Sequence, residues 1–127
     1  GNLYGTPKEY VLNQLEKVYD IILEIDPQGA MQIKNKFPEG IFVFLLPPSM
    51  KELRNRIVSR GRDSKDNIEK RLKCAYEEID FIKEYNYYII NDDLSKAVNS
   101  LVSVIEAERC RVKGDMSPLI KVYKEEE

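Results

Sequence analysis

Three arginines in the middle of the chain are spaced so that they could act on one anion. Arg56 and Arg60 are four residues apart, which places both guanidinium groups on one face of a helix. Arg71 falls on the next expected helix, beyond a turn at Gly61, and can swing toward them. Planar guanidinium donors match the equatorial oxygens of a phosphoryl group, over which charge spreads during transfer. The spacing therefore indicates phosphoryl transfer. The alternative is a solvated basic stripe whose ion pairs contribute about 0–1 kcal/mol each. Its acidic partners would be Glu52, Asp63, Asp66 and Glu69.

Two acidic residues lie at the end of a short apolar run, 20–26. The run is rich in β-branched residues and stops at Pro27, so it predicts a strand that is apolar on both faces. In P-loop nucleotide-binding proteins, a carboxylate at the end of such a strand lies near magnesium. This pattern singles out Asp26 and, less strongly, Glu24. Alternatively, both carboxylates only mark the end of the strand and bond to neighbouring backbone.

Hydroxyl and amide groups supply further candidates. Tyr4 and Thr6 belong to a small-residue turn beside an expected helix start, where hydroxyl groups can contact a phosphate or a base edge. A plain turn, with Thr6 as the N-cap of the helix, explains the same residues. Asn91 and the two aspartates after it follow an expected strand, where open α/β sheets place ligands. Asn91 could read an adenine edge, or the group could only cap the last helix.

Alternating strands and helices are expected to position these groups. The apolar patterns predict strands over 20–26, 41–46 and 87–90, and helices over 7–18, 28–36, 49–60 and from 63 or 64 to about 84, with a last helix around 97–105. Ser49, with Glu52 three residues on, predicts a capping box, and Gly61 predicts the turn of a helical hairpin. The order predicts an α/β fold with a parallel sheet that continues on its N-terminal side, because sheets usually have about 5–6 strands. The charged end, 117–127, is expected to be a mobile tail.

Composition limits the kinds of partner. The chain has 127 residues, of which 43% are hydrophobic and 33% charged, as expected for one α/β domain or part of one. A net charge of −2 gives no general reason to bind nucleic acid or an anionic membrane. The chain has two cysteines and no histidine, which argues against a zinc site or a disulfide framework and favours a cytoplasmic location. No apolar stretch is long enough to span a bilayer, so no membrane partner is expected.

Several short segments, taken in order, match the pattern of one known family. They are residues 4–6, 22–30, 44–49, 56–61, 71–72 and 91–94. The ordered set, which extends from Gly1 to about Arg109, resembles the guanylate kinase family. Two positions depart from the pattern: Pro27 replaces a larger apolar residue, and Arg62 replaces a residue that is often threonine.

The resemblance implies a role for each candidate residue. Tyr4 would hold the GMP phosphate and Thr6 the guanine, while Asp26, and more weakly Glu24, would lie near magnesium on the GMP side. Arg56, Arg60 and Arg71 would engage the ATP phosphates and the transferred group, and Asn91 would lie beside the adenine. The hairpin would be a mobile lid. Mg²⁺ would enter with ATP, without direct protein ligands.

The resemblance also implies how the chain is organised. Residues 1–112 would be the C-terminal part of a partial P-loop NTPase-like core, with the end of the GMP-binding region at 1–26 and the lid hairpin at 49–84. Residues 113–127 would be a tail. Relatives carry a phosphate-binding loop earlier in their sequences, and this chain has no Gly-Lys-Ser or Gly-Lys-Thr. We therefore expect a fragment of an ATP:GMP phosphotransferase that is inactive as an isolated chain.

Two alternatives stay open. A guanylate-kinase-like module that binds partner peptides would keep the fold without the chemistry, although the presence of all three arginines argues against it. The chain could also self-associate through an exposed sheet edge, because unpaired strand edges favour association.

Overall fold

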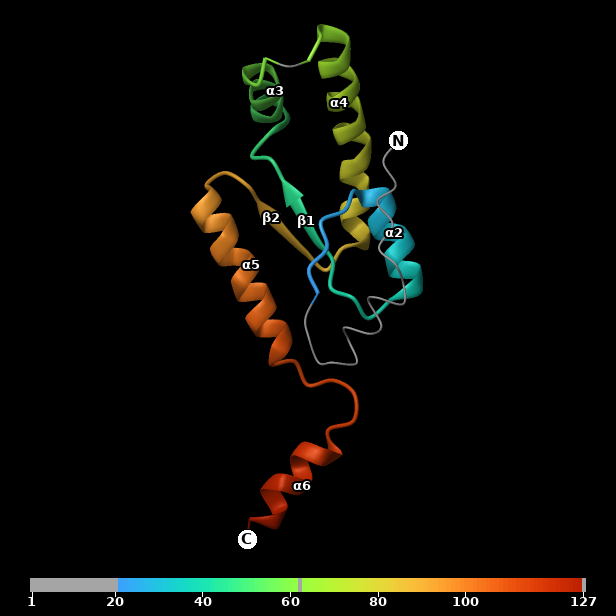
Figure 1. Cartoon of the computed structure of the whole chain (residues 1–127), viewed down its shortest axis with the longest axis vertical. Helices are drawn as coiled ribbons and strands as arrows, with labels where there is room; N and C mark the ends of the chain where they lie inside the picture. Colours follow the sequence, from blue (N-terminus) through green and yellow to red (C-terminus); the bar gives the residue numbers. More distant parts are fainter. Residues whose placement is uncertain (1–20, 62, 127) are drawn as a thin grey trace.

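The structure, a computed structural model, describes residues 21–61 and 63–126 (Figure 1). The predicted helix over 7–18 lies outside the described residues, as do Tyr4, Thr6 and Arg62. The described elements are α2 (Pro27–Lys36), β1 (Val43–Leu46), α3 (Met50–Ser59), α4 (Lys65–Glu78), the 3₁₀ helix η1 (Ile79–Glu84), β2 (Tyr87–Ile90), α5 (Leu94–Arg109) and α6 (Ser117–Glu125).

Strands β1 and β2 form a parallel pair, in register from Val43 opposite Tyr87 to Leu46 opposite Ile90. The chain crosses from one strand to the other through α3, α4 and η1. In Figure 1, α5 runs along one side of the strand pair and α2 lies on the other, while α3 and α4 extend beyond the carboxyl end of β1. The predicted α/β class with a parallel sheet is confirmed.

The prediction of a third strand over 20–26 is wrong for its described part. Residues 21–26 belong to no strand, and their exposure alternates from one residue to the next, with Ile22 70% exposed. An apolar run supplies β-propensity, but a strand also needs a hydrogen-bonded neighbour, and none of the described segments provides one.

Local capping explains where α2 begins. The carboxylate of Asp26 accepts a hydrogen bond from the Gly29 backbone N–H at 2.7 Å, and Pro27 occupies the first helical turn. Proline suits this position because its fixed φ is already helical and the missing N–H has no helical partner there. Pro27, which replaces a larger apolar residue of the family pattern, is thus compatible with a regular helix start.

The helical hairpin forms as predicted, with two differences. Ser49 caps α3 by accepting from the Glu52 N–H at 3.0 Å, and Gly61 turns the chain with φ of +64° before Ser64 caps α4. The capping box is only half formed, because the Glu52 side chain pairs with Arg56. The long helix predicted to about residue 84 is an α-helix to Glu78 and tightens into η1 at Ile79.

The core is small and centred on aromatic side chains. Among the described residues, the buried apolar side chains are Ala30, Phe42, Phe44, Ile57, Leu72 and Ile89. The Tyr85 ring packs edge-on against Phe44 at 4.8 Å between centroids and against Phe42 at 6.2 Å. Other strand residues, including Leu45, Tyr88 and Ile90, are at least half exposed. The strand pair is therefore covered over only part of each face.

The segment predicted to be a mobile tail, 117–127, contains a helix that the sequence did not lead us to expect, while its mobility stays a prediction. Residues Ser117–Glu125 form α6, with Pro118 in the first turn, and Asp115 accepts from the Ser117 N–H at 2.9 Å. Leu119, Ile120 and Tyr123 follow the helical spacing of an apolar face, and all are at least half exposed. The strong charge of the segment hid this spacing.

We expect the stability of this chain to fall in acid partly through one buried carboxylate. The Glu108 side chain is 11% exposed, and it accepts from Arg111 at 2.7 and 2.8 Å and from the Tyr87 hydroxyl at 2.6 Å. The bonds from Arg111, and then that from Tyr87, lower the pKa of Glu108 from 4.5 to about 2. Between these two pKa values, the Glu108 carboxyl group is protonated in the unfolded chain and still ionised in the folded chain. The stability that Glu108 contributes is therefore present above pH 4.5 and is lost as the pH falls toward 2.

Thermal unfolding between about pH 5 and pH 2.5 checks this expectation. The melting temperature of the wild type should fall more steeply with decreasing pH than that of Glu108→Gln, because glutamine at position 108 does not titrate. Equal slopes would show that Glu108 does not contribute.

Candidate functional site

A hollow of about 440 Å³ opens where the carboxyl ends of the strands meet the helical hairpin. Its lining residues are Leu45, Leu46, Pro47, Leu53, Arg56, Ile57, Arg60, Arg71, Ala75 and Asn91. Four of them, the three arginines and Asn91, are candidate site residues from the sequence. The structure therefore brings into one place groups that come from α3, from α4 and from the end of β2.

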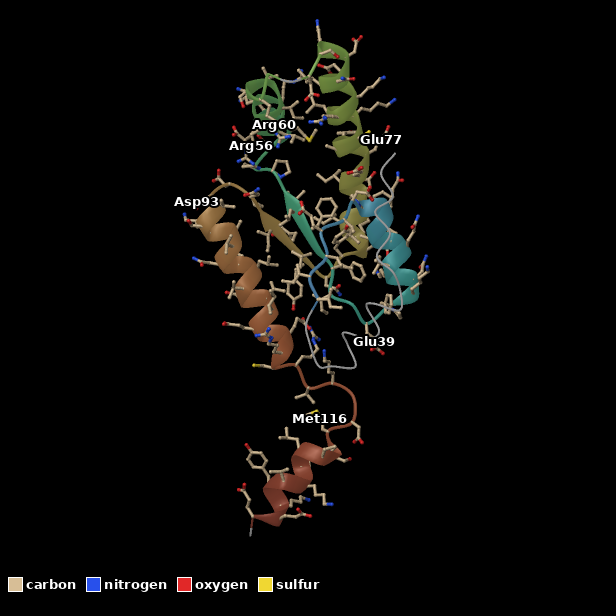
Figure 2. The ribbon with its side chains drawn as sticks, in the orientation of Figure 1. Glu39, Arg56, Arg60, Glu77, Asp93 and Met116 are labelled. Carbon is tan, nitrogen blue, oxygen red and sulfur yellow. The ribbon has the colours of Figure 1, made fainter. Side chains whose placement is uncertain are left out.

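Each polar group in this hollow is held by the element that carries it. Arg56 and Arg60 lie on either side of the buried Ile57, and Figure 2 shows both on the side of α3 that faces the strand ends. Arg71 precedes the buried Leu72 on α4. The Asn91 backbone N–H donates to the carbonyl of Leu46 at 2.7 Å, which keeps Asn91 beside the end of β1.

The guanidinium groups differ in their partners. Arg56 Nε lies 3.3 Å from Glu52 Oε1, and Arg71 Nη1 lies 3.3 Å from Asp63 Oδ2. Arg60 makes no ion pair within the part of the chain that the structure describes. Each recorded ion pair is a single contact, so most guanidinium N–H groups remain available to a bound anion. With three cations and two carboxylates, this side of the hairpin is positive and suits an anionic ligand.

A fourth arginine of the hairpin is engaged elsewhere. Arg54 forms two hydrogen bonds with Glu69, at 2.7 and 3.3 Å, and does not line the hollow. These bonds raise the pKa of Arg54 and lower the pKa of Glu69. Arg54 thus joins α3 to α4, and it provides a natural control for the arginines that line the hollow.

The acidic candidates lie outside the hollow. Asp26 caps α2, and Glu24 is an exposed side chain of the extended segment before it. Burial, and after it the charge of Asp26, raises the pKa of Glu78 and of Tyr85. Asp93 caps α5 by accepting from the Lys96 N–H at 3.1 Å, as the capping alternative predicts.

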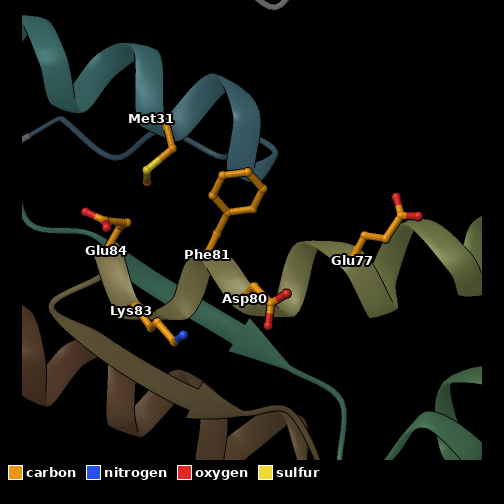
Figure 3. Close-up of a pocket in the computed structure, with 6 residues that line it drawn as sticks. All are labelled: Met31, Glu77, Asp80, Phe81, Lys83 and Glu84. Atoms are coloured by element: carbon orange, nitrogen blue, oxygen red, sulfur yellow. The ribbon is translucent and has the colours of Figure 1, made fainter.

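A second hollow, of about 310 Å³, lies between α2 and η1 (Figure 3). Its lining residues are Met31, Glu77, Asp80, Phe81, Lys83 and Glu84. Three acids and one lysine would repel a phosphate, and none of the sequence candidates lines this hollow. The hollow lined by the arginines is therefore the better candidate site.

Sequence reasoning missed several residues of the site. The apolar lining from Leu45, Leu46 and Pro47 was read only as a strand and its end, although a strand's carboxyl end is where ligands bind in open sheets. Asp63 was considered only as a helix start and as one of several neighbouring acids. Within residues 21–61 and 63–126, no group of three acidic, cysteine or histidine side chains is arranged to hold a metal ion.

Comparisons with known proteins point to one family. The family model described as guanylate kinase matches residues 1–108. A guanylate kinase of Caldanaerobacter subterraneus subsp. tengcongensis is 53% identical over 122 residues, which cover 96% of this chain and 59% of the relative. One of Clostridioides difficile is 48% identical over 125 residues, covering 98% of this chain and 61% of the relative.

A solved structure agrees with these sequence matches. The crystal structure of guanylate kinase from Anaplasma phagocytophilum matches with a TM-score of 0.69 at 29% identity, over 84% of this chain and 50% of that one. The chain thus spans somewhat more than half the length of the curated relatives and half of the solved chain.

Proposed function

We propose, because this chain belongs to the guanylate kinase family, that the protein containing it transfers the γ-phosphoryl group of ATP to GMP. A phosphate oxygen of GMP would bond to the γ-phosphorus as the bond to ADP breaks, giving GDP and ADP. One observation carries the proposal: Arg56, Arg60, Arg71 and Asn91 line a single hollow. Guanidinium groups placed around a phosphoryl group stabilise the charge that develops on its oxygens.

The proposed roles combine the positions of the described groups with the resemblance to the family. Arg56, Arg60 and Arg71 would bind the ATP phosphates and the transferred group, with the hairpin as a lid over 49–84. Asn91, held beside the end of β1, would contact the adenine. Tyr4, Thr6, Asp26 and Glu24 would belong to the GMP side, within region 1–26. The division into a core over 1–112 and a separate segment over 113–127 also stays a proposal.

Guanylate kinases use ATP with a divalent cation, which we propose to be Mg²⁺. Magnesium usually keeps several waters and binds through substrate phosphates with one or two carboxylates. In this mode the cation would arrive on the ATP phosphates, which the arginines of the hollow would bind. When bound, the cation would offset charge on the phosphate oxygens.

A peptide-binding module without phosphotransfer explains the site less well. Such a module needs no cluster of arginines, whereas here three arginines from two helices share one hollow.

A cytoplasmic location stays a prediction. No helix among the described residues is long and apolar enough to cross a membrane. Self-association stays a prediction too, and the uncovered side chains of the strand pair are compatible with it.

A coupled ADP-release assay with ATP, GMP and magnesium tests the proposal. The 127-residue chain alone should be inactive, since it contains no Gly-Lys-Ser or Gly-Lys-Thr to hold the ATP phosphates. The alignment with the Caldanaerobacter relative leaves part of that relative unmatched. A fusion of this unmatched part to the chain should regain activity. Activity of the chain alone would refute the fragment interpretation, and a folded but inactive fusion that fails to bind GMP in calorimetry would favour the binding module.

A further inference from the structure

We propose that Asp63 is a positioning residue that holds the Arg71 guanidinium toward the arginine-lined hollow, an inference that rests on the proposed function. Asp63 lies in the turn between α3 and α4, two residues after Gly61. Its Oδ2 lies 3.3 Å from Arg71 Nη1. The contact therefore connects the turn of the hairpin to one of the three arginines.

Asp63 is more buried than the other acids that pair with arginines in the hairpin. Its side chain is 15% exposed, against 43% for Glu52 and 53% for Glu69. An ion pair is screened less by water and salt when one partner is largely buried. The Asp63 carboxylate can thus restrict Arg71 more effectively than an exposed acid could.

No acid on α4 itself could take over this role. The residues three and four positions from Arg71, where helical neighbours meet, are Asn67, Ile68, Cys74 and Ala75. None of them carries a negative charge. Arg56 differs, because Glu52 precedes it by four positions on the same helix. The orientation of Arg71 depends on an acid that the fold of the turn supplies.

The Asp63–Arg71 and Arg54–Glu69 ion pairs lie on different sides of the hairpin. Arg54 and Arg56 are two positions apart, as are Glu69 and Arg71, and two positions rotate a side chain about 200° around a helix. Arg56 and Arg71 line the hollow, whereas the Arg54–Glu69 pair does not. Glu69 therefore gives a matched control: an acid that pairs with an arginine of the same hairpin, away from the site.

The carboxylate of Asp63 could affect a bound anion in two opposite ways. Holding a long, flexible arginine in place favours binding, because less side-chain freedom is lost when the anion arrives. A negative charge near the anion opposes binding. The recorded contact uses one guanidinium nitrogen and leaves the other donors of Arg71 available. We expect positioning to dominate, so that removal of the carboxylate weakens binding.

Calorimetry with inorganic tripolyphosphate and NMR of the 127-residue chain test this inference. In Asp63→Asn, the tripolyphosphate affinity should fall roughly 10-fold, the lower end of the loss seen when a partner that orients a metal-binding side chain is removed. The ¹⁵N relaxation of Arg71 Nε should show a more mobile side chain. Asp63→Glu should restore part of both effects, and Glu69→Gln should change neither. Circular dichroism checks that each variant is folded.

Tighter binding by Asp63→Asn would show that the carboxylate acts as a competing charge and would overturn the inference. Equal mobility of Arg71 in wild type and variant would overturn it as well. Should no form of the chain bind tripolyphosphate, the same titration with the fusion would test the arginine site of the proposed function, while the mobility of Arg71 would still decide the role of Asp63.

Discussion

Arg60→Ala should lower the phosphotransfer rate of the fusion enzyme by about 10³-fold or more. Losses of this size are typical when an arginine that contacts the transferred phosphoryl group is removed. Among the described residues, Arg60 alone of the three arginines makes no recorded ion pair with an acid. Its full charge is thus available to the oxygens of the transferred group. The coupled ADP-release assay measures the loss, and most of it should lie in kcat because the charge develops in the transition state.

Arg54→Ala is the matched control for this prediction. Arg54 lies on the same helix and carries the same charge, but it pairs with Glu69 outside the hollow. This change removes an exposed pair, so activity should stay within about twofold of the unchanged fusion. Similar losses in both variants would mean that general positive charge, and not the position of Arg60, supports activity.

Phe44→Ala should lower the free energy of unfolding of the chain by about 3–5 kcal/mol, the usual cost of deleting a buried aromatic ring. Phe44 is 9% exposed and packs against the Tyr85 ring at 4.8 Å. Small domains are typically stable by only about 5–15 kcal/mol, so this loss removes a large share of the stability. Urea unfolding followed by circular dichroism measures the loss.

Tyr88→Ala is the control for that experiment, because Tyr88 is the register partner of Phe44 on the neighbouring strand. Tyr88 is 63% exposed, and its removal should cost less than about 1 kcal/mol. Equal costs at the two positions would show that Phe44 is no better covered than Tyr88 in solution.

Features that depend on a few neighbouring residues could be predicted from the sequence. The N-cap at Ser49 and the turn at Gly61 were read correctly, and the next helix was expected to start at Asp63 or at Ser64, which is its cap. A cap bonds to a backbone N–H three residues away, and a positive φ favours glycine. The one-face spacing of Arg56 and Arg60 also follows from helix geometry alone.

The errors occurred where distant parts of the chain decide the outcome. The apolar run before Pro27 resembles a strand, but it pairs with no described neighbour. The helix after Ser64 changes to a 3₁₀ helix at Ile79, shortly before the aromatic contacts of Tyr85. The helix after residue 116 was missed for another reason: its helical spacing is local, but the charge of the segment was given more weight.

By itself, the sequence determined the helical hairpin, the two strands and the family to which the chain belongs. Only the tertiary structure decided that Arg71 and Asn91 reach the same hollow as Arg56 and Arg60, and that Asp63 pairs with Arg71. Helix and strand periodicity determine which side chains share a face of one element. The angle between two helices and the position of a strand end depend on packing between residues far apart in the chain, which no local pattern records.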